Sequence, residues 1–331
     1  MNPRLIHCDG SKCIINIIWI NVVLETNQVR RYTMEYININ HKIYKLVKGN
    51  RTDETYRKSF NALTEKTFGF NFEQWYQNGY WKDQYIPYSL LDGDKVISNV
   101  SVNLMDIHVF GQSKRFIQLG TVMTDEAYRK QGLIREILHN VLEDWQSKCA
   151  GIYLFANASV LDFYPKFGFK KWNQYQCSKI ICSTSEVKNI QKLNMSDENN
   201  RKFLYHKVNA AIPYGEISME RNGELILFYC SSFMKENVYY LPDQDIVVVA
   251  NYEQDCLEIL GIFCEREVSL DWVIDYMATK DTKSVKLHFT PKEVDSYVIR
   301  STDEEDTLFI LGEDTMGLTD KQFMFPTLSH T

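Results

Sequence analysis

Two cations and a glycine precede a predicted helix in the stretch TVMTDEAYRKQGLIREILHN at 121–140. An apolar segment ends in a polar turn with Arg129, Lys130 and Gly132, and apolar residues at helical spacing follow directly. Cations are disfavoured at a helix start, where unpaired backbone N–H groups form the positive end of the helix dipole. A bound anion would reverse this, because the N–H groups and both cations would attract it. The stretch therefore predicts a phosphate-binding turn.

The glycine supports a phosphate site, but the common nucleotide motifs are missing from this turn. Gly132 would let a phosphate approach the backbone without a Cβ in the way. Neither GxxxxGK(S/T) nor GxGxxG is present, which disfavours nucleotide hydrolysis and dinucleotide redox chemistry. Taken alone, the turn is better explained as a solvated surface turn, so a functional interpretation depends on a second motif.

The second motif is FANASVLDFYPKFGF at 155–169. RKQGLI after one predicted strand, then an asparagine and FYPKFGF after the next strand, resembles the GNAT superfamily of acyl-CoA-dependent N-acyltransferases. The resemblance covers about 40–181. It implies an α+β protein with the GNAT fold, a mixed and mostly antiparallel sheet with flanking helices.

The resemblance also implies a site for acetyl-CoA as co-substrate. The strands expected at 116–124 and 151–157 would separate, and the pantetheine arm would lie between them. Backbone groups of Val122 and Thr124 would pair with the arm, and Asn157 would hydrogen-bond to it. The pyrophosphate would rest on the phosphate turn, which consists of Arg129, Lys130, Gln131, Gly132, Leu133 and Ile134, with Arg135 just beyond.

Direct acyl transfer to an amine needs a neutral nucleophile, donors for the developing oxyanion and an acid for the departing thiolate. The resemblance implies that Phe163 and Tyr164 line the thiol end of the arm, with Tyr164 as the acid. Core packing explains Tyr164 as an alternative, since phenylalanines surround it. The backbone N–H of Val122 or Met123 would polarise the thioester carbonyl.

The general base is left open. Many relatives carry a glutamate on the strand before the turn, where this chain offers only Gln118. Asp106 and His108 on the preceding strand, or a water, are alternatives. A further one is the carboxylate of Thr331, because in the two-domain branch typified by the enhanced-intracellular-survival (Eis-like) acetyltransferases the chain's own C-terminus enters the active site. His330 is expected on the surface without a role.

Ile134 favours that two-domain branch. The usual pattern in the superfamily has a small residue at this position, and the bulkier isoleucine is similar to the Eis-like proteins. The length of 331 residues suggests two domains in any case. We expect an N-terminal extension at 1–33 upstream of the functional chain, a GNAT domain at 34–182, a linker at 183–202 and a second α+β domain at 203–331.

Hydrophobic patterning predicts the elements that position these residues. A strand is expected at 42–49, an amphipathic helix at 52–68, and a hairpin at 86–107 that turns at Asp92-Gly93-Asp94. A short helix is expected at 159–167, followed by a strand at 168–181 that closes the first sheet. In the second domain we expect a helix at 270–278. The strands expected there lie at 225–232, 245–253, 256–264, 285–289 and 307–312.

The composition of the chain argues against several classes of binding partner. The net charge of −6 argues against a nucleic-acid-binding protein. The histidines show no HxxxH or HxxE spacing, so no metal is predicted, and eight cysteines without a CxxC pair suggest thiols in a reducing cytoplasm. The apolar segment at 14–24 is too short to span a membrane. We expect a cytoplasmic protein with no membrane partner and possibly a homo-oligomer.

Two functions remain from different classes. The leading prediction is an N-acetyltransferase that transfers an acetyl group from acetyl-CoA to a primary amine of a small molecule. The alternative is a GNAT-fold protein that binds acyl-CoA without turnover, which the missing strand glutamate favours modestly. The aromatic segment WYQNGYWKDQY at 75–85 would either wall an acceptor pocket or pack in the core.

Overall fold

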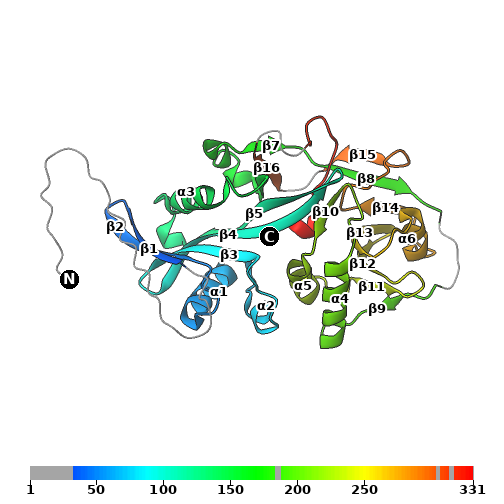
Figure 1. The fold of residues 1–331 in the computed structure, drawn as a ribbon, viewed down its shortest axis with the longest axis horizontal. Coiled ribbons are helices and arrows are strands. Elements are labelled where there is room, and N and C mark those ends of the chain that lie inside the picture. The colour runs from blue at the N-terminus through cyan, green and yellow to red at the C-terminus, as the bar shows by residue number, and fades with distance from the viewer. Residues whose placement is uncertain (1–32, 183–187, 303–305, 313–316, 331) are drawn as a thin grey trace, which may run out of the picture.

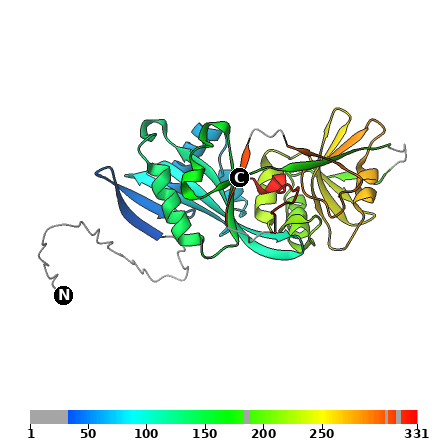
Figure 2. The same cartoon turned by 90° about the horizontal axis from the view of Figure 1, so that it is seen from above.

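The computed structural model describes residues 33–182, 188–302, 306–312 and 317–330. Two sheets lie side by side along the long axis of the molecule, with the C-terminus between them (Figures 1 and 2). The predicted extension at 1–33, except Thr33, and the predicted catalytic residue Thr331 lie outside the described residues.

The first sheet carries the strands on either side of the phosphate turn. In the described part of the chain it runs β1-β2-β3-β4-β5-β6-β16-β7, and β10 pairs with the far half of β4. Only β5 and β6 pair in parallel among these neighbours. The strands are β1 (Thr33–Ile39), β2 (Lys42–Lys48), β3 (Tyr85–Asp92), β4 (Lys95–Val109), β5 (Gln112–Thr124), β6 (Gly151–Ala156), β7 (Lys170–Trp172), β10 (Ile217–Glu220) and β16 (Thr307–Leu311).

The second sheet runs β15-β8-β14-β13-β12-β11-β9 in the described residues. Its core consists of apolar side chains from β12 and β13 that pack with α6 (Leu270–Met277). The strands are β8 (Tyr175–Ile180), β9 (Gln191–Lys192), β11 (Val238–Leu241), β12 (Ile246–Glu253), β13 (Cys256–Phe263), β14 (Ser284–Leu287) and β15 (Val298–Ser301).

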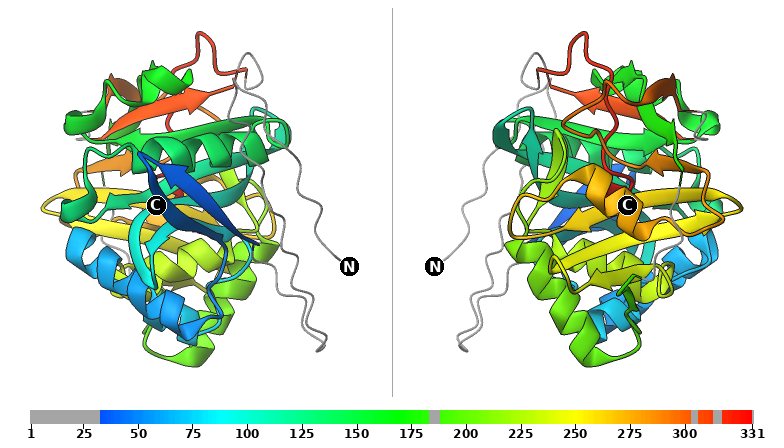
Figure 3. Two further views of the ribbon diagram at one scale, coloured as in Figure 1. Left: turned by 90° about the vertical axis from the view of Figure 1, so that its left-hand side faces the viewer. Right: turned by 90° about the vertical axis from the view of Figure 1, so that its right-hand side faces the viewer.

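Helices cover the two faces of the first sheet (Figures 1 and 3). On one face, α3 (Leu133–Trp145) packs its apolar stripe on β3, β4 and β5. On the other face lie α1 (Glu54–Phe68) and α2 (Glu73–Gln77), which we call the α1 face. That face continues into α5 (Gly223–Ser232), which packs on α4 (Glu198–Ala210), so the two halves share one core.

Most expected elements of the first sheet are confirmed. The helix α1 begins after the Asp53 cap and ends at Gly69, which adopts the left-handed conformation. The hairpin of β3 and β4 turns at the expected residues. The segment expected as a helix at 159–167 instead forms two short 3-10 helices, η2 (Ala158–Val160) and η3 (Tyr164–Phe167).

Two strands lie in a different sheet from the one their sequence position suggests. Residues 168–181 were expected to close the first sheet. Its first part, β7, does so, but β8 belongs to the second sheet. Conversely, β16 near the C-terminus inserts between β6 and β7 and completes the first sheet. The chain thus crosses between the sheets in both directions, which no local pattern encodes.

The strand expected at 225–232 is wrong, because these residues form α5. Leu225, Ile226 and Leu227 are all buried, since the helix packs on more than one side. A helix that is apolar all round loses its period of 3.6 and cannot be distinguished from a buried strand by pattern.

No helix in the described residues is long and apolar enough to cross a bilayer.

Candidate active site

The strands on either side of the predicted arm are paired over only part of their length. The parallel ladder of β5 and β6 begins at Phe116 and Gly151 and ends at Leu119 and Leu154. Beyond it, β5 runs on beside β4 to Thr124, and β6 runs on beside β16 to Ala156. We call residues 120–124 of β5 and 155–156 of β6 the unpaired segment, because there the two strands are not paired with each other. Its facing backbone edges are free to bond an extended ligand.

Backbone alternation shows which groups of β5 face this segment. The amide of Asp125 donates to the Ile97 carbonyl at 2.8 Å, and Met123 is in register with Asn99 of β4. In an antiparallel pair successive residues point their backbone groups to opposite edges. The groups of Met123 therefore face β4, whereas the Val122 carbonyl and the Thr124 amide face the unpaired segment.

The phosphate turn leads from β5 into α3. Gly132 is the N-cap residue of α3 with φ of 83°, and no side chain caps this helix start. A Cβ built on Gly132 would meet nothing within 4 Å, so the space over the turn is open. The first N–H groups of α3 thus remain available to an anion.

Cations surround the open helix start. Arg129, Lys130 and Arg135 are exposed, and Lys130 has a positive φ of 63°. The Arg129 side chain donates to the Thr124 carbonyl at 3.4 Å and lies 4.0 Å from Glu126. Among the described residues, these contacts leave guanidinium donors free. The turn therefore offers exposed cations and backbone donors that would suit an anion.

Tyr164 lies in the core on the α3 side of the sheet. It is 4% exposed, and its ring contacts Phe163, Phe169 and Phe309 with centroids 5.3 to 6.0 Å apart. Burial raises the pKa of Tyr164 to about 12. The phenol therefore keeps its proton at neutral pH and can act as a hydrogen-bond donor.

Asn157 and Phe163 lie near the end of β6. The Asn157 Oδ1 accepts from the amide and hydroxyl of Ser159 at 3.1 and 2.5 Å and so caps η2. Because Oδ1 is used in this way, the Nδ2 group is the part of the Asn157 side chain that suits a ligand carbonyl. Phe163 is half-buried and packs beside Tyr164.

The C-terminal residues lie against β6 on the α1 face. The His330 ring stacks on Phe155, the first residue of β6 beyond the ladder, with centroids 3.4 Å apart. The Tyr153 hydroxyl donates to the Ser329 carbonyl at 3.4 Å, and the Tyr229 hydroxyl of α5 donates to the His330 carbonyl. The surface position expected for His330 is therefore wrong, because this side chain packs at the unpaired segment.

His330 is partly buried, and its imidazole is neutral. Burial lowers the pKa of its imidazole to about 3. Its Nε2 atom is inaccessible to solvent and has no hydrogen-bond partner among the described residues. Sequence reasoning missed this residue because nothing in FMFPTLSHT indicates which side chains turn inward.

The alternative bases lie elsewhere. Asp106 forms a two-pronged ion pair with Arg115, with distances of 2.8 and 2.9 Å, and His108 accepts from the Gly111 amide. Arg115 is six residues before Thr121, roughly 20 Å along an extended strand. Gln118 is buried and bonded to Asn103 and to the Leu119 carbonyl. The structure does not bring the Asp106 or His108 side chain to the unpaired segment.

The aromatic segment packs mainly as core. Trp75, Tyr80, Trp81 and Tyr85 are all at least nine-tenths buried, while Tyr76 is only partly buried. The Trp75 indole donates to the Glu224 carbonyl of α5 at 2.8 Å, which ties α2 to α5. Core packing, one of the two expected readings, accounts for most of this segment.

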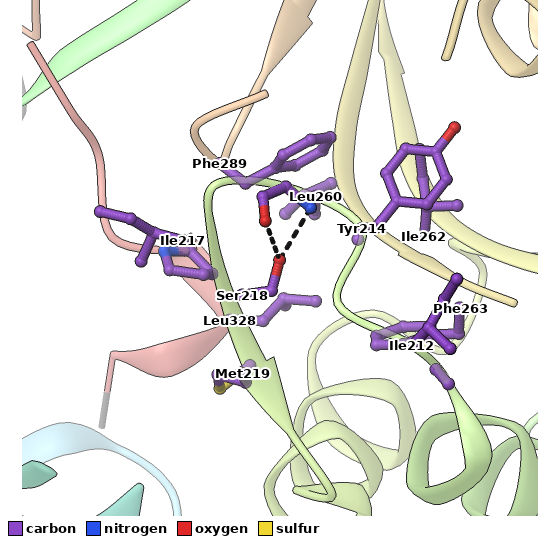
Figure 4. A pocket seen from close by; sticks show the side chains of 14 residues that line it. Ile212, Tyr214, Ile217, Ser218, Met219, Leu260, Ile262, Phe263, Phe289 and Leu328 are labelled. Atoms are coloured by element: carbon purple, nitrogen blue, oxygen red, sulfur yellow. Dashed lines mark hydrogen bonds between the residues drawn. The ribbon is translucent and has the colours of Figure 1, made fainter. Parts of the chain in front are cut away.

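A small apolar pocket lies behind the C-terminal segment (Figure 4). Its lining includes Ile217 and Met219 of β10, Leu260 and Ile262 of β13, and Leu328. Its polar contacts are internal, since the Ser218 hydroxyl bonds the amide and carbonyl of Gly215 at 2.8 and 3.2 Å. An apolar lining of this kind does not suit a phosphate.

Metal and disulfide chemistry find no site in the described ranges. No group of three or more His, Cys, Asp or Glu side chains there is placed to hold a metal ion. Six cysteines lie in those ranges and each is free. Burial raises the pKa of the thiols of Cys149, Cys177, Cys230 and Cys264, so these groups are inert core thiols.

Known proteins share this arrangement. Residues 50–172, which include β5, the phosphate turn, α3 and β6, match the family model of the acetyltransferase (GNAT) domain. No curated protein matches the chain in sequence. The match supports acyl transfer as the general type of reaction.

Solved structures extend the similarity in fold. A conserved protein of unknown function and probable N-acyltransferase from Enterococcus faecalis V583 is 14% identical with a TM-score of 0.54, covering 86% of this chain and 74% of that one. A GCN5-related N-acetyltransferase from Kribbella flavida is 13% identical with a TM-score of 0.50, covering 84% and 71%. Eis1 from Mycobacterium abscessus is 12% identical with a TM-score of 0.49, covering 84% and 72%.

At these identities the first two structures show the fold alone. Because each covers more than four fifths of this chain, the common fold extends beyond residues 50–172. The expected α+β GNAT fold is confirmed. The chain therefore contains an acetyltransferase (GNAT) domain at residues 50–172.

Proposed function

We propose that this protein is an N-acetyltransferase that uses acetyl-CoA to acetylate a primary amine of a small molecule. The observation that carries the proposal is the open helix start at Gly132, which continues directly from the unpaired segment of β5. The two features suit the two parts of acetyl-CoA, a pyrophosphate and an extended amide-containing arm.

Each part of acetyl-CoA has residues that would hold it. The pyrophosphate would accept hydrogen bonds from the first N–H groups of α3 and from Arg129 and Lys130. The arm would pair with the Val122 carbonyl and the Thr124 amide, which face the unpaired segment. Asn157 Nδ2 would donate to an arm carbonyl. Met123 would contribute packing, since its backbone faces β4 and its side chain is buried.

Transfer would proceed by direct attack of the amine on the thioester carbonyl. The Val122 amide would donate to the developing oxyanion. The Tyr164 phenol, with a pKa of about 12, is a weaker acid than a thiol of ordinary pKa near 8.5. We therefore assign it a hydrogen bond to the departing thiolate, with the proton delivered finally by solvent.

The C-terminal carboxylate of Thr331 is the proposed base. Ser329 and His330 are fixed by Tyr153, Phe155 and Tyr229 at the unpaired segment. The next residue carries the carboxylate, so it would lie within one residue's reach of the thioester. This arrangement supports the Eis-like branch, in which the second domain positions the chain's end.

The second candidate function is acyl-CoA binding without turnover. It is favoured by β5, where Gln118 is bonded on both sides and supplies no carboxylate. The two functions differ in whether an amine accelerates thiol release.

A thiol-reagent assay separates them. Acetyl-CoA is incubated with the protein and with one amine. The amines are spermidine, kanamycin, a short peptide with a free N-terminus, and Nα-acetyl-lysine amide, whose side-chain amine is free. We expect at least one amine to raise thiol release above the rate with acetyl-CoA alone, and mass spectrometry should show an added acetyl group. Binding of CoA without any amine-dependent release would refute the enzyme.

A further inference from the structure

One residue of β5 has a backbone conformation that its side chain disfavours. Thr121 has φ of 48°, in the left-handed region, where a β-branched residue is an outlier. The register explains why it lies there, because Ser101 pairs with Gly120 and Asn99 pairs with Met123. Thr121 and Val122 thus oppose the single residue Val100 in a β-bulge. The bulge begins two residues after the β5–β6 ladder ends.

Two buried side chains hold Thr121 at two points. Asn99 Nδ2 donates to the Thr121 carbonyl at 2.9 Å, and the Tyr85 hydroxyl lies 2.7 Å from Thr121 Oγ1. Ser101 donates to the Tyr85 oxygen at 2.9 Å, so the proton of Tyr85 is directed to Thr121. We call Tyr85, Asn99 and Ser101 the bulge clamp. All three are 4% exposed or less.

The clamp is itself fixed from behind. Ser89 donates to Asn99 Oδ1 at 2.8 Å, and the hydroxyl of Tyr56 on α1 lies 2.7 Å from Ser89 Oγ. Asn99 therefore has its acceptor satisfied and both of its donors engaged, with Ser101 and with Thr121. A fully satisfied buried network of this kind is rigid.

The clamp sets the direction of one particular amide. A peptide unit is planar, and its C=O and N–H point in opposite directions. When Asn99 holds the Thr121 carbonyl, it also fixes the Val122 N–H, which points away from Asn99. Strained backbone persists only where the surroundings impose it, and it concentrates at functional sites.

From this geometry we infer that the bulge clamp positions the Val122 amide as the oxyanion donor. Tyr85 and Asn99 are positioning residues, since they act on the substrate only through Thr121. The inference rests on the proposed function, because it assigns a role within acetyl transfer.

The test measures the hydrogen bond directly, by isotope-edited infrared spectra of protein-bound acetyl-CoA labelled with ¹³C at the carbonyl. A donor lowers the stretching frequency of this carbonyl. We expect wild type to show a lowered band and Tyr85→Phe to shift it back toward free acetyl-CoA. Thr121→Val removes the same contact from the other side and should do the same. With the fastest amine of the panel, both variants should lose about tenfold in kcat with little change in KM for acetyl-CoA.

Glycine distinguishes positioning from general damage. Glycine adopts a positive φ without steric cost, so in Thr121→Gly the backbone conformation at position 121 depends less on the bulge clamp. The double variant Tyr85→Phe with Thr121→Gly should regain the lowered band and most of kcat. A matched control is Tyr88→Phe, which removes a β3 hydroxyl bonded to Asp144 and Trp145 on the opposite face. It should lose stability but leave the band and kcat unchanged.

The outcomes separate this inference from the proposed function. A wild-type band position in folded Tyr85→Phe, or no recovery in the double variant, would overturn the inference. A lowered, clamp-dependent band without any amine acetylation would overturn only the proposed enzyme. Failure of wild type to bind acetyl-CoA would overturn both.

Discussion

The His330 ring stacks on the Phe155 ring, with centroids 3.4 Å apart and an angle of 24° between their planes. This stack joins the penultimate residue of the chain to the strand that borders the predicted acyl site. Ser329 and His330 thereby lie beside the unpaired segment.

The first prediction concerns the C-terminal carboxylate. Deleting His330 and Thr331 should lower kcat about a hundredfold, the usual contribution of a general base, with less than a threefold change in the Kd of CoA. Adding two glycines after Thr331 moves the carboxylate without removing a packed residue, and it should have the same effect. Steady-state kinetics and calorimetric CoA titration measure both quantities. Unchanged turnover in the extended variant would assign the base to a water.

The stack also predicts a pH effect on stability. His330 has a pKa of about 3 when folded, against about 6.5 when unfolded, so the unfolded chain binds more protons between these values. Stability contributed by the neutral ring is therefore lost as pH falls below about 6.5. From pH 7 to pH 5 the loss should be about 2 kcal/mol. Urea unfolding of wild type and His330→Phe at both pH values checks this. An equal loss of unfolding free energy from pH 7 to pH 5 in the two proteins would contradict it.

Tyr164→Phe should separate chemistry from packing. Its hydroxyl has no hydrogen-bond partner among the described residues, so the variant should unfold at nearly the wild-type temperature. If the phenol bonds the departing thiolate, kcat should fall about tenfold to a hundredfold while the Kd of CoA stays the same. Below pH 9 this ratio should not vary with pH, because a phenol of pKa about 12 remains protonated. A wild-type kcat would leave Tyr164 as a core residue.

The sequence predicted the local elements around the proposed site well. The phosphate turn, α3 and the two strands around it follow from short-range signals, namely a glycine at a helix start and apolar spacing. The two motifs RKQGLI and FYPKFGF, in this order, indicated the GNAT fold. These signals are local because a helix start needs only its own first turn.

Long-range pairing was not predictable in the same way. The exchange of β8 and β16 between sheets depends on partners more than 100 residues apart along the chain. The run at 225–232 has no period because α5 is buried on several sides. Thr121 gave no signal either, since a threonine within a strand pattern normally continues the strand. Its conformation is imposed by Tyr85 and Asn99 from neighbouring strands.

The most direct test of the account is CoA binding by two glycine variants. Gly132 and Gly111 have φ of 83° and 86°, and an added Cβ meets nothing within 4 Å at either, so the two substitutions to glutamate carry the same backbone strain. Gly132→Glu places a carboxylate over the α3 start, where it would oppose a phosphate, whereas Gly111→Glu lies in the β4–β5 turn. Calorimetry should show CoA binding weakened at least about a hundredfold, or about 2.8 kcal/mol, in Gly132→Glu and unchanged in Gly111→Glu. Equal CoA affinity in both variants and wild type would contradict the phosphate turn and the function built on it.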